Sequence, residues 1–286
     1  MQLENILISG LKKDSFYWHQ DGYKSPIRNW DDLAKVNAIY AAVSSQDEKG
    51  EGEKSKADIE MIKNKLNDGV VLDLGCGYGR LAKYLLPIRK FSGYIGVDSS
   101  VNMLDIFFKR YQERSLEQAT PLMLINSDID KILVKDGSVD NVIVSAVFLH
   151  NHKTITVRAI NEIYRILKPN GKLFVIGSFP NNFSLAGLQG EIYNFILKIL
   201  GRGYKNGPVR YFSKKEIENK LNKFNKREVY FVCFTFFTKS IIIFPKFLNK
   251  IYRKAFFDPV DKFLLLVLPE KIKKLFCTHF DVVAYK

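Results

Sequence analysis

A glycine-rich loop between a short apolar segment and an amphipathic segment constrains this chain more than any other feature. The apolar segment covers residues 70–74, VVLDL, and the loop follows as GCGYGR, residues 75–80. Glycines permit a tight turn and let a ligand approach the backbone without Cβ atoms in the way. A helix after such a loop presents unpaired N–H groups and the positive end of its dipole. This order predicts a ligand-binding turn at the end of a buried strand.

The spacing of the loop and one later carboxylate narrow the ligand. The loop reads G-x-G-x-G, and Arg80 stands where a dinucleotide-binding fingerprint has its third glycine. A pyrophosphate needs the close approach that this glycine permits, so a nicotinamide dehydrogenase is excluded. Asp98 ends the next predicted strand, where a carboxylate binds both hydroxyls of a ribose. Together these features predict a cofactor that contains a nucleoside.

Strands and helices alternate through the middle of the chain. Apolar runs predict strands at 70–74, 94–97, 122–125, 140–144 and 172–176, and helical spacing predicts helices at 57–66, 80–86, 101–116 and 156–167. Such alternation implies parallel pairing through right-handed crossovers, and therefore a doubly wound sheet. The later segments predict helices at 185–200, after Ser213 and within 245–276, and strands at 229–237 and 280–285.

These patterns divide the chain into three segments. Residues 1–56 hold an aromatic segment with a helix expected at 31–43 and a polar linker at 44–56. Residues 57–180 form the predicted cofactor-binding core. Residues 181–286 are expected to complete the same domain with a helix, an insertion and the last strands. The helix within residues 181–212 is either a lid over an acceptor pocket or a helix packed permanently on the sheet.

At this point the chain resembles a known family. The stretch from Val70 to Ile176 is similar to the class I S-adenosylmethionine-dependent methyltransferases, in the branch that acts on small molecules and lipids. The motifs that carry the resemblance are VLDLGCGYGR, GYIGVDSSVNML, NSDIDKIL, DGSVDNVIVSAVFLHN and INEIYRILKPNGKLFVIG, with Asn170 where a glycine is more usual. VRYFSKKEIENKL and HFDVVAYK fit more loosely. The resemblance implies a Rossmann-like α/β fold: a doubly wound, mostly parallel seven-stranded sheet with helical insertions and a last antiparallel strand.

The resemblance also implies the residues that bind the cofactor. In its terms Asp98 holds the ribose, Asp128 meets the adenine amine and Ser145 lies near the transferring methyl group. The full set implied for S-adenosylmethionine is Asp73, Gly75, Gly77, Gly79, Asp98, Ser99, Met103, Asp128, Ile129 and Ser145. Tyr17, Trp18 and Tyr40 could close over the cofactor from the N-terminal segment, although aromatic residues there are as often simple core.

The chemistry asks little of the protein beyond alignment. A methyl group on a sulfonium is already activated, so proximity and orientation dominate the transfer. A general base is needed only if the acceptor must lose a proton early. His150, and after it His152, are the candidate bases because they follow the fourth core strand. The alternative is that both histidines serve packing and loop structure.

Charge is unevenly distributed along the chain. The net charge is +14, and residues 198–274 hold 19 Lys and Arg against 6 Asp and Glu. This excess fits a solvated lysine-rich surface, an anionic membrane surface or a polyanionic substrate such as nucleic acid. Apolar residues at helical spacing, interleaved with lysines, fit a helix lying in a membrane interface. The alternative is that the apolar face packs on the domain and the lysines point to water, since amphipathic helices of globular proteins look similar. The apolar positions of this helix would be Phe247, Leu248, Ile251 and Tyr252.

The remaining composition bounds the setting. Cys76, Cys233 and Cys277 are far apart, so neither a disulfide framework nor a metal site is expected, and a reducing, cytoplasmic compartment fits best. The N-terminal residues do not form a secretory signal, and no apolar run approaches the roughly 18–20 residues of a membrane-spanning helix.

The sequence therefore predicts methyl transfer from S-adenosylmethionine to an unidentified small-molecule or lipid-like acceptor. One alternative is an RNA methyltransferase, which the positive charge favours. Nucleic acid is disfavoured because Ser145-Ala146-Val147-Phe148 stands where base-modifying relatives carry an N-P-P-Y-type tetrapeptide. The other alternative is a protein that binds the cofactor without turnover. Oligomeric state is left open.

Overall fold

The computed structural model describes residues 2–14, 16–23, 30, 53–87, 91–113, 120–201, 210–234 and 258–286 of the chain. The helix expected at 31–43, Tyr40 and the interfacial helix expected around 247–252 lie outside this part. The strands are β1 (Lys12–Asp14), β2 (Tyr17–His19), β3 (Val70–Leu74), β4 (Gly93–Asp98), β5 (Leu122–Asn126), β6 (Val139–Ser145), β7 (Leu167–Pro180), β8 (Lys226–Phe234) and β9 (Cys277–Tyr285). The helices are η1 (Leu3–Ile6), α3 (Glu53–Lys65), α4 (Ala82–Leu85), α5 (Val101–Glu113), η3 (Phe148–His150), α6 (Lys153–Ile166), α7 (Leu185–Ile199), α8 (Lys214–Lys220), α11 (Asp258–Val267) and α12 (Glu270–Phe276).

The described strands form one sheet in the order β1-β2-β5-β4-β3-β6-β7-β9-β8. Strands β3 to β7 pair in parallel, and β9 lies antiparallel between β7 and β8. The predicted α/β class, with its mostly parallel sheet and antiparallel last strand, is confirmed. The sheet has nine strands rather than the expected seven, because β1 and β2 extend it beyond β5. Segments of three residues are too short for a periodic pattern to predict.

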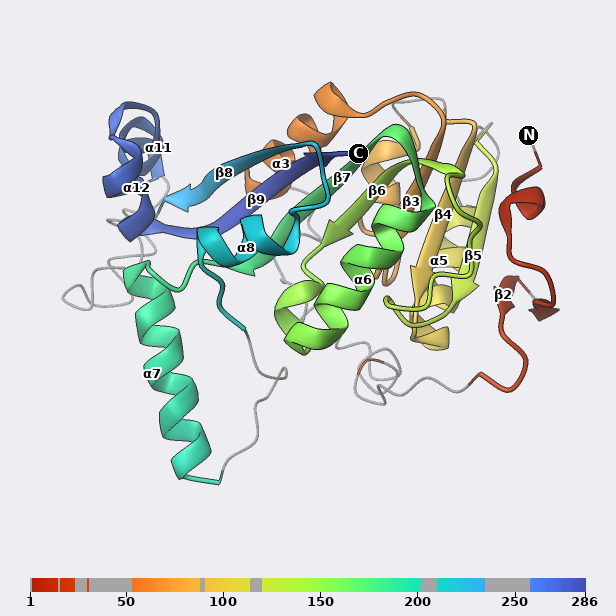
Figure 1. The fold of residues 1–286 in the computed structure, drawn as a ribbon, viewed down its shortest axis with the longest axis horizontal. Helices are drawn as coiled ribbons and strands as arrows, with labels where there is room; N and C mark the ends of the chain where they lie inside the picture. The colour runs from red at the N-terminus through yellow and green to blue at the C-terminus, as the bar shows by residue number, and fades with distance from the viewer. Residues whose placement is uncertain are drawn as a thin grey trace.

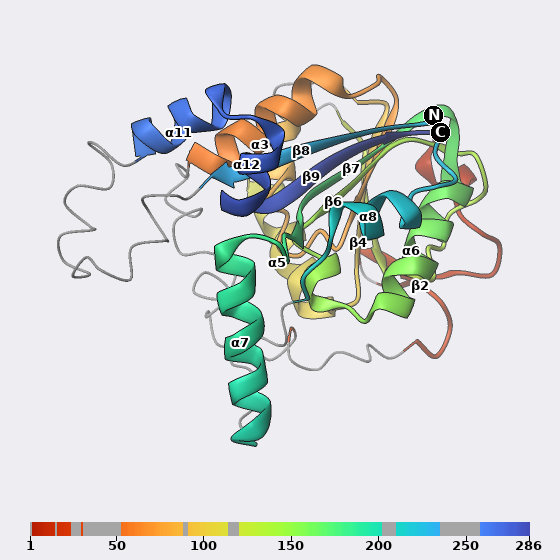
Figure 2. The ribbon, with the colours of Figure 1, turned by 60° about the vertical axis from the view of Figure 1, so that its left-hand side comes forward.

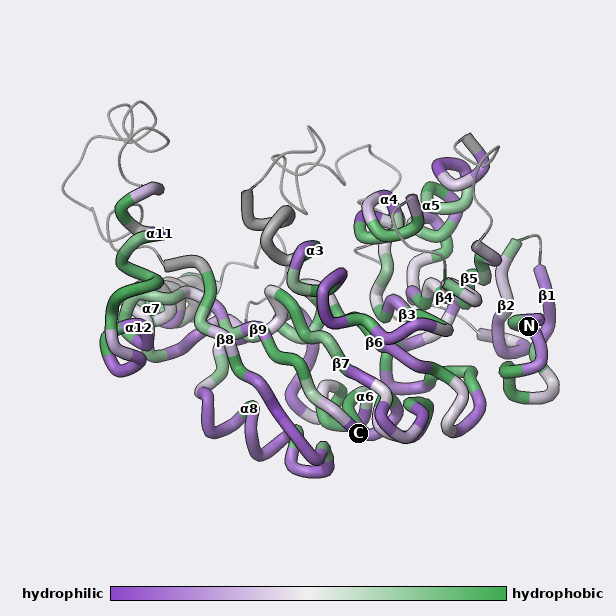
Figure 3. Tube along the Cα trace, turned by 90° about the horizontal axis from the view of Figure 1, so that it is seen from above, coloured by the Kyte–Doolittle hydropathy of each residue, from purple (hydrophilic) through white to green (hydrophobic). Residues whose placement is uncertain are grey.

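Helices cover both faces of the sheet. Seen from above, α3, α4 and α5 lie on one side of the strands, and α6 and α8 lie on the other (Figure 3). The N-terminal strands and the helices α7, α11 and α12 lie at opposite ends of the molecule (Figure 1). The view in Figure 2 shows α7 extending away from the sheet rather than lying along it.

Alternation along β3 explains how the sheet buries both faces. Val70, Leu72 and Leu74 join the core cluster on the side of α6 and α8, whereas Val71 joins the cluster on the side of α3 to α5. Successive side chains of a strand point to opposite faces, so a strand that is covered twice reads as a continuous apolar run. Asp73 interrupts this run, and it is buried. The one charged residue of β3 therefore marks the ligand-binding end of the strand.

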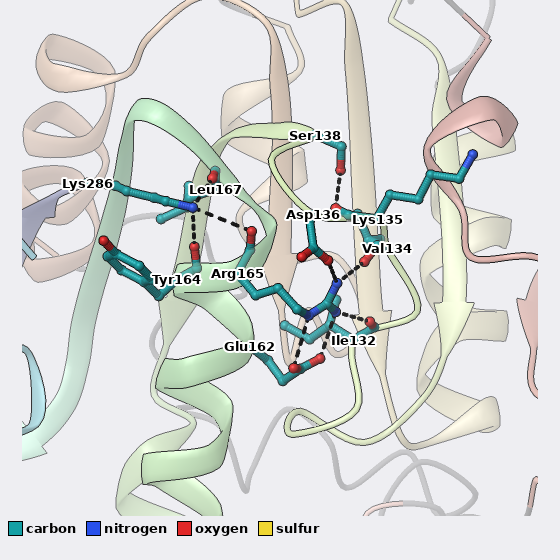
Figure 4. A network of polar contacts seen from close by, with 10 residues as sticks. All are labelled: Ile132, Val134, Lys135, Asp136, Ser138, Glu162, Tyr164, Arg165, Leu167 and Lys286. Carbon is teal, nitrogen blue, oxygen red and sulfur yellow. Dashed lines mark hydrogen bonds and ion pairs between the residues drawn. The ribbon is translucent and has the colours of Figure 1, made fainter. Parts of the chain in front are cut away.

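A polar network holds the C-terminal end of α6, on the side of the sheet opposite the ligand-binding end of β3 (Figure 4). The Arg165 guanidinium donates to the backbone carbonyls of Ile132 and Val134, and it pairs with Asp136 at 2.6 Å. The Lys286 ammonium donates to the carbonyls of Tyr164 and Leu167, both at 2.6 Å. Cations stabilise the carbonyl end of a helix. The network thus ties the loop before β6 and the end of β9 to α6.

Two segments depart from the predicted boundaries. Helix α3 begins at Glu53, so residues 53–56 belong to a helix and not to the expected linker. Glu and Lys are good helix formers, which accounts for the early start. Strand β7 begins at Leu167, where helix α6 ends. Asn170, within the first residues of β7, has φ +65°, a conformation that asparagine tolerates better than most residues, so it can replace glycine.

Candidate functional site

The glycine loop is held against the end of the neighbouring strand. The amides of Gly75 and Cys76 both donate to the carbonyl of Val97, at 2.7 and 3.1 Å. The Gly77 amide donates to Asp98 Oδ2 at 2.9 Å. Because β3 and β4 pair in parallel, their carboxyl ends meet at the same edge of the sheet. The loop and the ribose acid predicted from the sequence are therefore neighbours in space.

The three glycines of the loop are needed for different reasons. All three have positive φ, at 72° for Gly75, 52° for Gly77 and 77° for Gly79. A side chain on Gly75 would overlap Val147, and one on Gly79 would overlap the Phe107 ring. A Cβ on Gly77 would meet no protein atom within 4 Å. Gly77 alone therefore leaves space that a ligand can use, whereas the other two permit close packing.

Asp98 is fixed in place by backbone amides. Its Oδ1 accepts from the Ser100 amide at 2.9 Å, and its Oδ2 accepts from Gly77 as above. Asn126 donates to the backbone carbonyls of Asp98 and Ser99, which ties β4 to β5 at this edge. A carboxylate oxygen has further acceptor capacity after one hydrogen bond. Asp98 is partly exposed and can accept hydroxyl groups as well.

Asp73 is a buried carboxyl with few partners. It is 2% exposed and accepts a hydrogen bond from the Tyr94 hydroxyl at 2.9 Å. Burial raises the pKa of Asp73 to about 7, although the Tyr94 hydrogen bond and the Arg80 charge act in the opposite direction. A buried acid of this kind gains free energy when a cation approaches it. Asp73 is therefore suited to a ligand ammonium group.

These groups surround one cavity of about 440 Å³. Nine of the ten residues implied for the cofactor line it: Asp73, Gly75, Gly77, Asp98, Ser99, Met103, Asp128, Ile129 and Ser145. Gly79 does not, because it packs against Phe107 instead. The structure thus brings the predicted residues together, and their contacts with a cofactor stay a prediction.

The cavity also has walls that the sequence did not reveal. Trp30 lines it, and this side chain packs beside the cluster of Tyr78 and Met103. Tyr23 donates to Asp128 Oδ1 at 3.1 Å, and burial raises the pKa of both groups. The N-terminal segment therefore reaches the cavity from a distance of about a hundred residues in sequence. Its aromatic content was the signal.

The predicted aromatic residues of that segment lie elsewhere. Tyr17 and Trp18 belong to β2, which pairs with β5, and neither lines the cavity. Trp18 instead packs against the core cluster of the sheet. These two side chains take the structural alternative stated for them, because the three-residue strand directs them onto the sheet.

Arg80 and Ser145 join opposite sides of the cavity. The Arg80 guanidinium donates to Ser145 Oγ at 2.7 Å, and both residues line the cavity. In the sequence, Arg80 served only to exclude a pyrophosphate. Its position adds a cation beside Asp73, and guanidinium groups bind carboxylates strongly. The cavity can therefore receive a ligand that carries both an ammonium and a carboxylate.

His150 lies on the cavity wall and His152 does not. The Nδ1 atom of His150 is buried and has no hydrogen-bond partner in the described part of the chain. Burial lowers the pKa of His150, so its neutral form predominates at neutral pH. The ring meets Trp30 edge-on, with centroids 5.5 Å apart. His152 instead caps α6, where its side chain accepts from the Thr154 amide.

Backbone strain marks the turn between β6 and His150. Ala146 has φ +56° and lines the cavity. A non-glycine residue rarely adopts this conformation, and such strain concentrates at functional sites. The local sequence gives no sign of it, since alanine is an ordinary helix former. Ala146 turns the chain so that Ser145 and Val147 both face the cavity.

The far end of the molecule takes no part in this cavity. No described residue of α7, α11 or α12 lines it. The lid proposed for residues 181–212 therefore stays a prediction. Within the described ranges, no helix is long and apolar enough to cross a membrane, and His, Cys, Asp and Glu nowhere gather into a metal-binding group.

Comparisons with known proteins indicate the same class of enzyme as the sequence motifs. Residues 72–175 match the family described as methyltransferase domain. An uncharacterized methyltransferase of Schizosaccharomyces pombe is 29% identical over 175 residues, covering 59% of this chain and 56% of the relative. A demethylmenaquinone methyltransferase of Thermotoga maritima is 30% identical over 143 residues, covering 50% and 57%. The chain thus spans a little over half the length of these two relatives.

A solved structure supports the fold. A SAM-dependent methyltransferase from Archaeoglobus fulgidus superposes with a TM-score of 0.51 at 16% identity, covering 84% of this chain and 97% of that one. The matched family segment includes most of β3 and all of β4 to β6, with the glycine loop, Asp98, Asp128 and His150. Residues 72–175 therefore match a methyltransferase domain, in a fold that the chain shares with a SAM-dependent methyltransferase.

Proposed function

We propose that this chain transfers a methyl group from S-adenosylmethionine to a hydrophobic small-molecule or lipid-like acceptor. The observation that carries the proposal is the single cavity shared by the glycine loop, Asp98 and His150. The residues expected to hold the cofactor and the candidate base line the same cavity. The matched methyltransferase domain supports the same chemistry.

The residues present fit the cofactor. The space above Gly77 is open, Asp98 offers a fixed carboxylate for a ribose, and Asp73 offers a buried one for an ammonium group. Arg80 supplies the cation for a carboxylate. Asp128 would meet the adenine amine in exchange for the Tyr23 hydroxyl. When bound, the cofactor supplies a methyl group that its positive sulfur has already activated.

The protein then contributes orientation, exclusion of water and a place for a proton. Trp30 and Val147 close the cavity near His150, which limits the positions open to an acceptor. Alignment of the acceptor atom with the methyl group is the main requirement of the reaction. We expect neutral His150, which lines the cavity, to accept a proton there from a weakly acidic acceptor.

The acceptor wall favours a hydrophobic molecule. Trp30, Val147 and Ile155 line the cavity beside the cofactor residues. Apolar and aromatic walls with few polar groups are typical of sites for small apolar ligands. One relative carries the name demethylmenaquinone methyltransferase, which supports a hydrophobic acceptor here. The setting we propose is the cytoplasm with peripheral contact to a membrane, and the buried free thiols of Cys76 and Cys277 fit a reducing compartment.

Two experiments test the function. Radiolabelled S-adenosylmethionine is incubated with the protein and, separately, with extracted lipids, small metabolites and RNA. Label in the lipid or small-molecule fraction supports the proposal. Label in RNA alone would replace it with the nucleic-acid alternative, and cofactor binding without transfer to any fraction would favour a non-catalytic binding protein.

The second experiment concerns the base. His150→Gln should lower the rate of transfer by roughly 10²-fold or more while leaving cofactor affinity unchanged. Because burial lowers the pKa of His150, the wild-type rate should fall only at pH values below the ordinary histidine range. This acid limb should vanish in His150→Gln. A normal rate in the variant would return His150 to a packing role.

A further inference from the structure

We propose that helices α7, α11 and α12 form a docking face for an anionic lipid bilayer. The face comprises the exposed apolar side chains of these helices, represented by Ile192, Phe195, Ile199, Phe263, Leu266 and Val267. It lies at the end of the molecule away from the N-terminal strands (Figures 1 and 2). It deepens the proposed function, which includes peripheral contact to a membrane, by naming the surface that makes this contact, and it requires neither cofactor nor acceptor.

The degree of exposure is unusual for side chains of this size. Phe195 is 64% exposed, Ile199 is 68% exposed and Leu266 is 79% exposed. Single exposed apolar residues are common, but a large cluster of them marks an interaction surface. Apolar residues of helix α6 are packed instead, since Ile160 and Ile163 belong to the main core. By contrast, Ile192, Phe195 and Ile199 of α7 belong to none of the core clusters of the described residues.

The helices of the face are linked to one another. Helix α12 contacts α7, and both α11 and α12 contact β8. The Asn181 side chain, just before α7, donates to the carbonyls of Lys274 and Cys277 at 2.7 and 2.8 Å. The Lys274 ammonium lies 4.1 Å from the centre of the Phe183 ring. These contacts hold α7 and α12 in one arrangement, so the face is presented by the fold itself.

The positive charge of this part of the sequence favours an anionic lipid bilayer as the binding partner of the face. The stretches that follow α7 and β8 in the sequence, residues 202–209 and 235–257, hold seven Lys and Arg and no Asp or Glu. Helix α12 adds Lys271, Lys273 and Lys274 against Glu270, whereas α7 and α11 together hold two Lys and three Asp and Glu. An apolar surface in a part of the sequence with a net positive charge fits a bilayer interface, where apolar burial and attraction to anionic lipid add. A second copy of this chain would bring the same positive charge against itself and is disfavoured.

The test uses the full chain and vesicles without cofactor or acceptor. Vesicles of phosphatidylglycerol and phosphatidylcholine in equal parts are compared with vesicles of phosphatidylcholine alone, by co-sedimentation at low and high salt. The expected result is binding to the anionic vesicles that weakens as salt rises. Because the assay contains no S-adenosylmethionine, its failure is separate from failure of the proposed methyl transfer.

Two pairs of variants locate the contact. Phe195→Ser combined with Leu266→Ser should weaken binding to anionic vesicles at least about tenfold, since each removes a large apolar group. The matched control, Ile8→Ser combined with Val157→Ser, changes exposed apolar residues elsewhere and should bind as wild type. Lys262→Glu combined with Lys271→Glu should weaken binding by roughly tenfold or more, whereas Lys13→Glu combined with Lys109→Glu should not.

Three outcomes would overturn the inference. Absence of binding to anionic vesicles at low salt removes it directly. Equal weakening by the face variants and the controls means that the contact lies elsewhere. A dimer seen by sedimentation velocity, and disrupted by Phe195→Ser with Leu266→Ser, would assign the face to a second copy of the chain.

Discussion

The cavity and the face formed by α7, α11 and α12 differ in the kind of side chain that each presents. At the cavity, two carboxylates have partners within the chain: buried Asp73 accepts from the Tyr94 hydroxyl, and partly exposed Asp98 accepts from the amides of Gly77 and Ser100. At the other end, large apolar side chains stand in water, with Leu266 79% exposed. The first region is the site proposed for a small polar ligand, and the second is the face proposed for an apolar partner. The two proposed binding surfaces therefore differ in chemistry.

The largest expected effect lies in the cavity and follows from Asp98→Ala. The change removes the proposed ribose contacts and leaves the amides of Gly77 and Ser100 without their partner. Hydrogen bonds to charged groups contribute about 1.5–3 kcal/mol each, so affinity for S-adenosylmethionine should fall about ten- to a hundredfold. Isothermal titration calorimetry measures it.

The control for this prediction is an acid outside the cavity. Asp136 pairs with Arg165 at the opposite edge of the sheet, so Asp136→Ala should bind the cofactor as wild type. Near-unchanged affinity in a folded Asp98→Ala variant would contradict the cofactor assignment for this end of the molecule.

Alanine substitutions at Gly77 and Gly137 distinguish loss of space for a ligand from backbone strain. The effect on cofactor affinity is expected to be smaller than that of Asp98→Ala. Gly77 and Gly137 both have positive φ, 52° and 56°, and a Cβ on either would meet no protein atom within 4 Å. Alanine at either position should cost about 1–2 kcal/mol of unfolding free energy from strain alone. Gly77 also lines the cavity, so Gly77→Ala should lower cofactor affinity, by about tenfold if crowding costs as much as overpacking does elsewhere. Equal affinity in both variants would mean that the ligand does not approach the loop at Gly77.

The buried acid predicts a pH effect of modest size. Because the pKa of Asp73 is about 7 without ligand, a ligand ammonium that binds the ionised form should bind about fivefold more tightly at pH 7 than at pH 6. Asp73→Asn should abolish this dependence. In the cofactor-free protein the effect of pH has the opposite sign. Because burial raises the pKa of Asp73, the folded protein loses stability as the pH rises from about 4 to 7.

Asp73→Asn is therefore tested by two measurements, the melting temperature and the affinity for the cofactor. Asp73→Asn should melt higher than wild type at pH 7.5, because no charge is buried, and it should bind the cofactor less tightly at the same pH. A wild-type affinity that is flat between pH 6 and 7 would show that the amino group is bound by backbone and not by this carboxylate.

Local sequence was enough to place most of the cavity. Residues 70–74 were predicted as a strand with the bounds that β3 has, and Asp98 was placed at the end of β4. These features rest on short-range rules: continuous apolar runs, glycine turns and an acid at a strand end. Such rules act within a few residues, so the sequence states them directly. They also fixed the capping of α8, where Ser213 accepts from the Glu216 amide.

The parts that escaped prediction depend on long-range contacts. Trp30 reaches the cavity across more than a hundred residues to meet His150, and Arg80 meets Ser145 across 65 residues. No periodicity encodes such pairs. The strain at Ala146 is set by the turn between β6 and η3, and β1 and β2 are too short to show alternation. The positions of these residues could therefore be known only from the three-dimensional structure.

The smallest expected effect sharpens the comparison at the other end. An amphipathic helix looks the same in sequence whether its apolar face is packed or exposed, and unfolding measurements distinguish the two cases. Ile199 on α7 is 68% exposed, so Ile199→Ser should change the unfolding free energy by no more than about 0.5 kcal/mol. Ile163 on α6 is fully buried, and Ile163→Ser should cost about 2–5 kcal/mol or more. Urea unfolding of both variants at low protein concentration makes the comparison. A cost above about 1.5 kcal/mol for Ile199→Ser would show that part of the chain covers α7 in solution, because surface substitutions rarely cost so much. The apolar face would then be part of the core, and the second binding surface would be lost while the cavity remained.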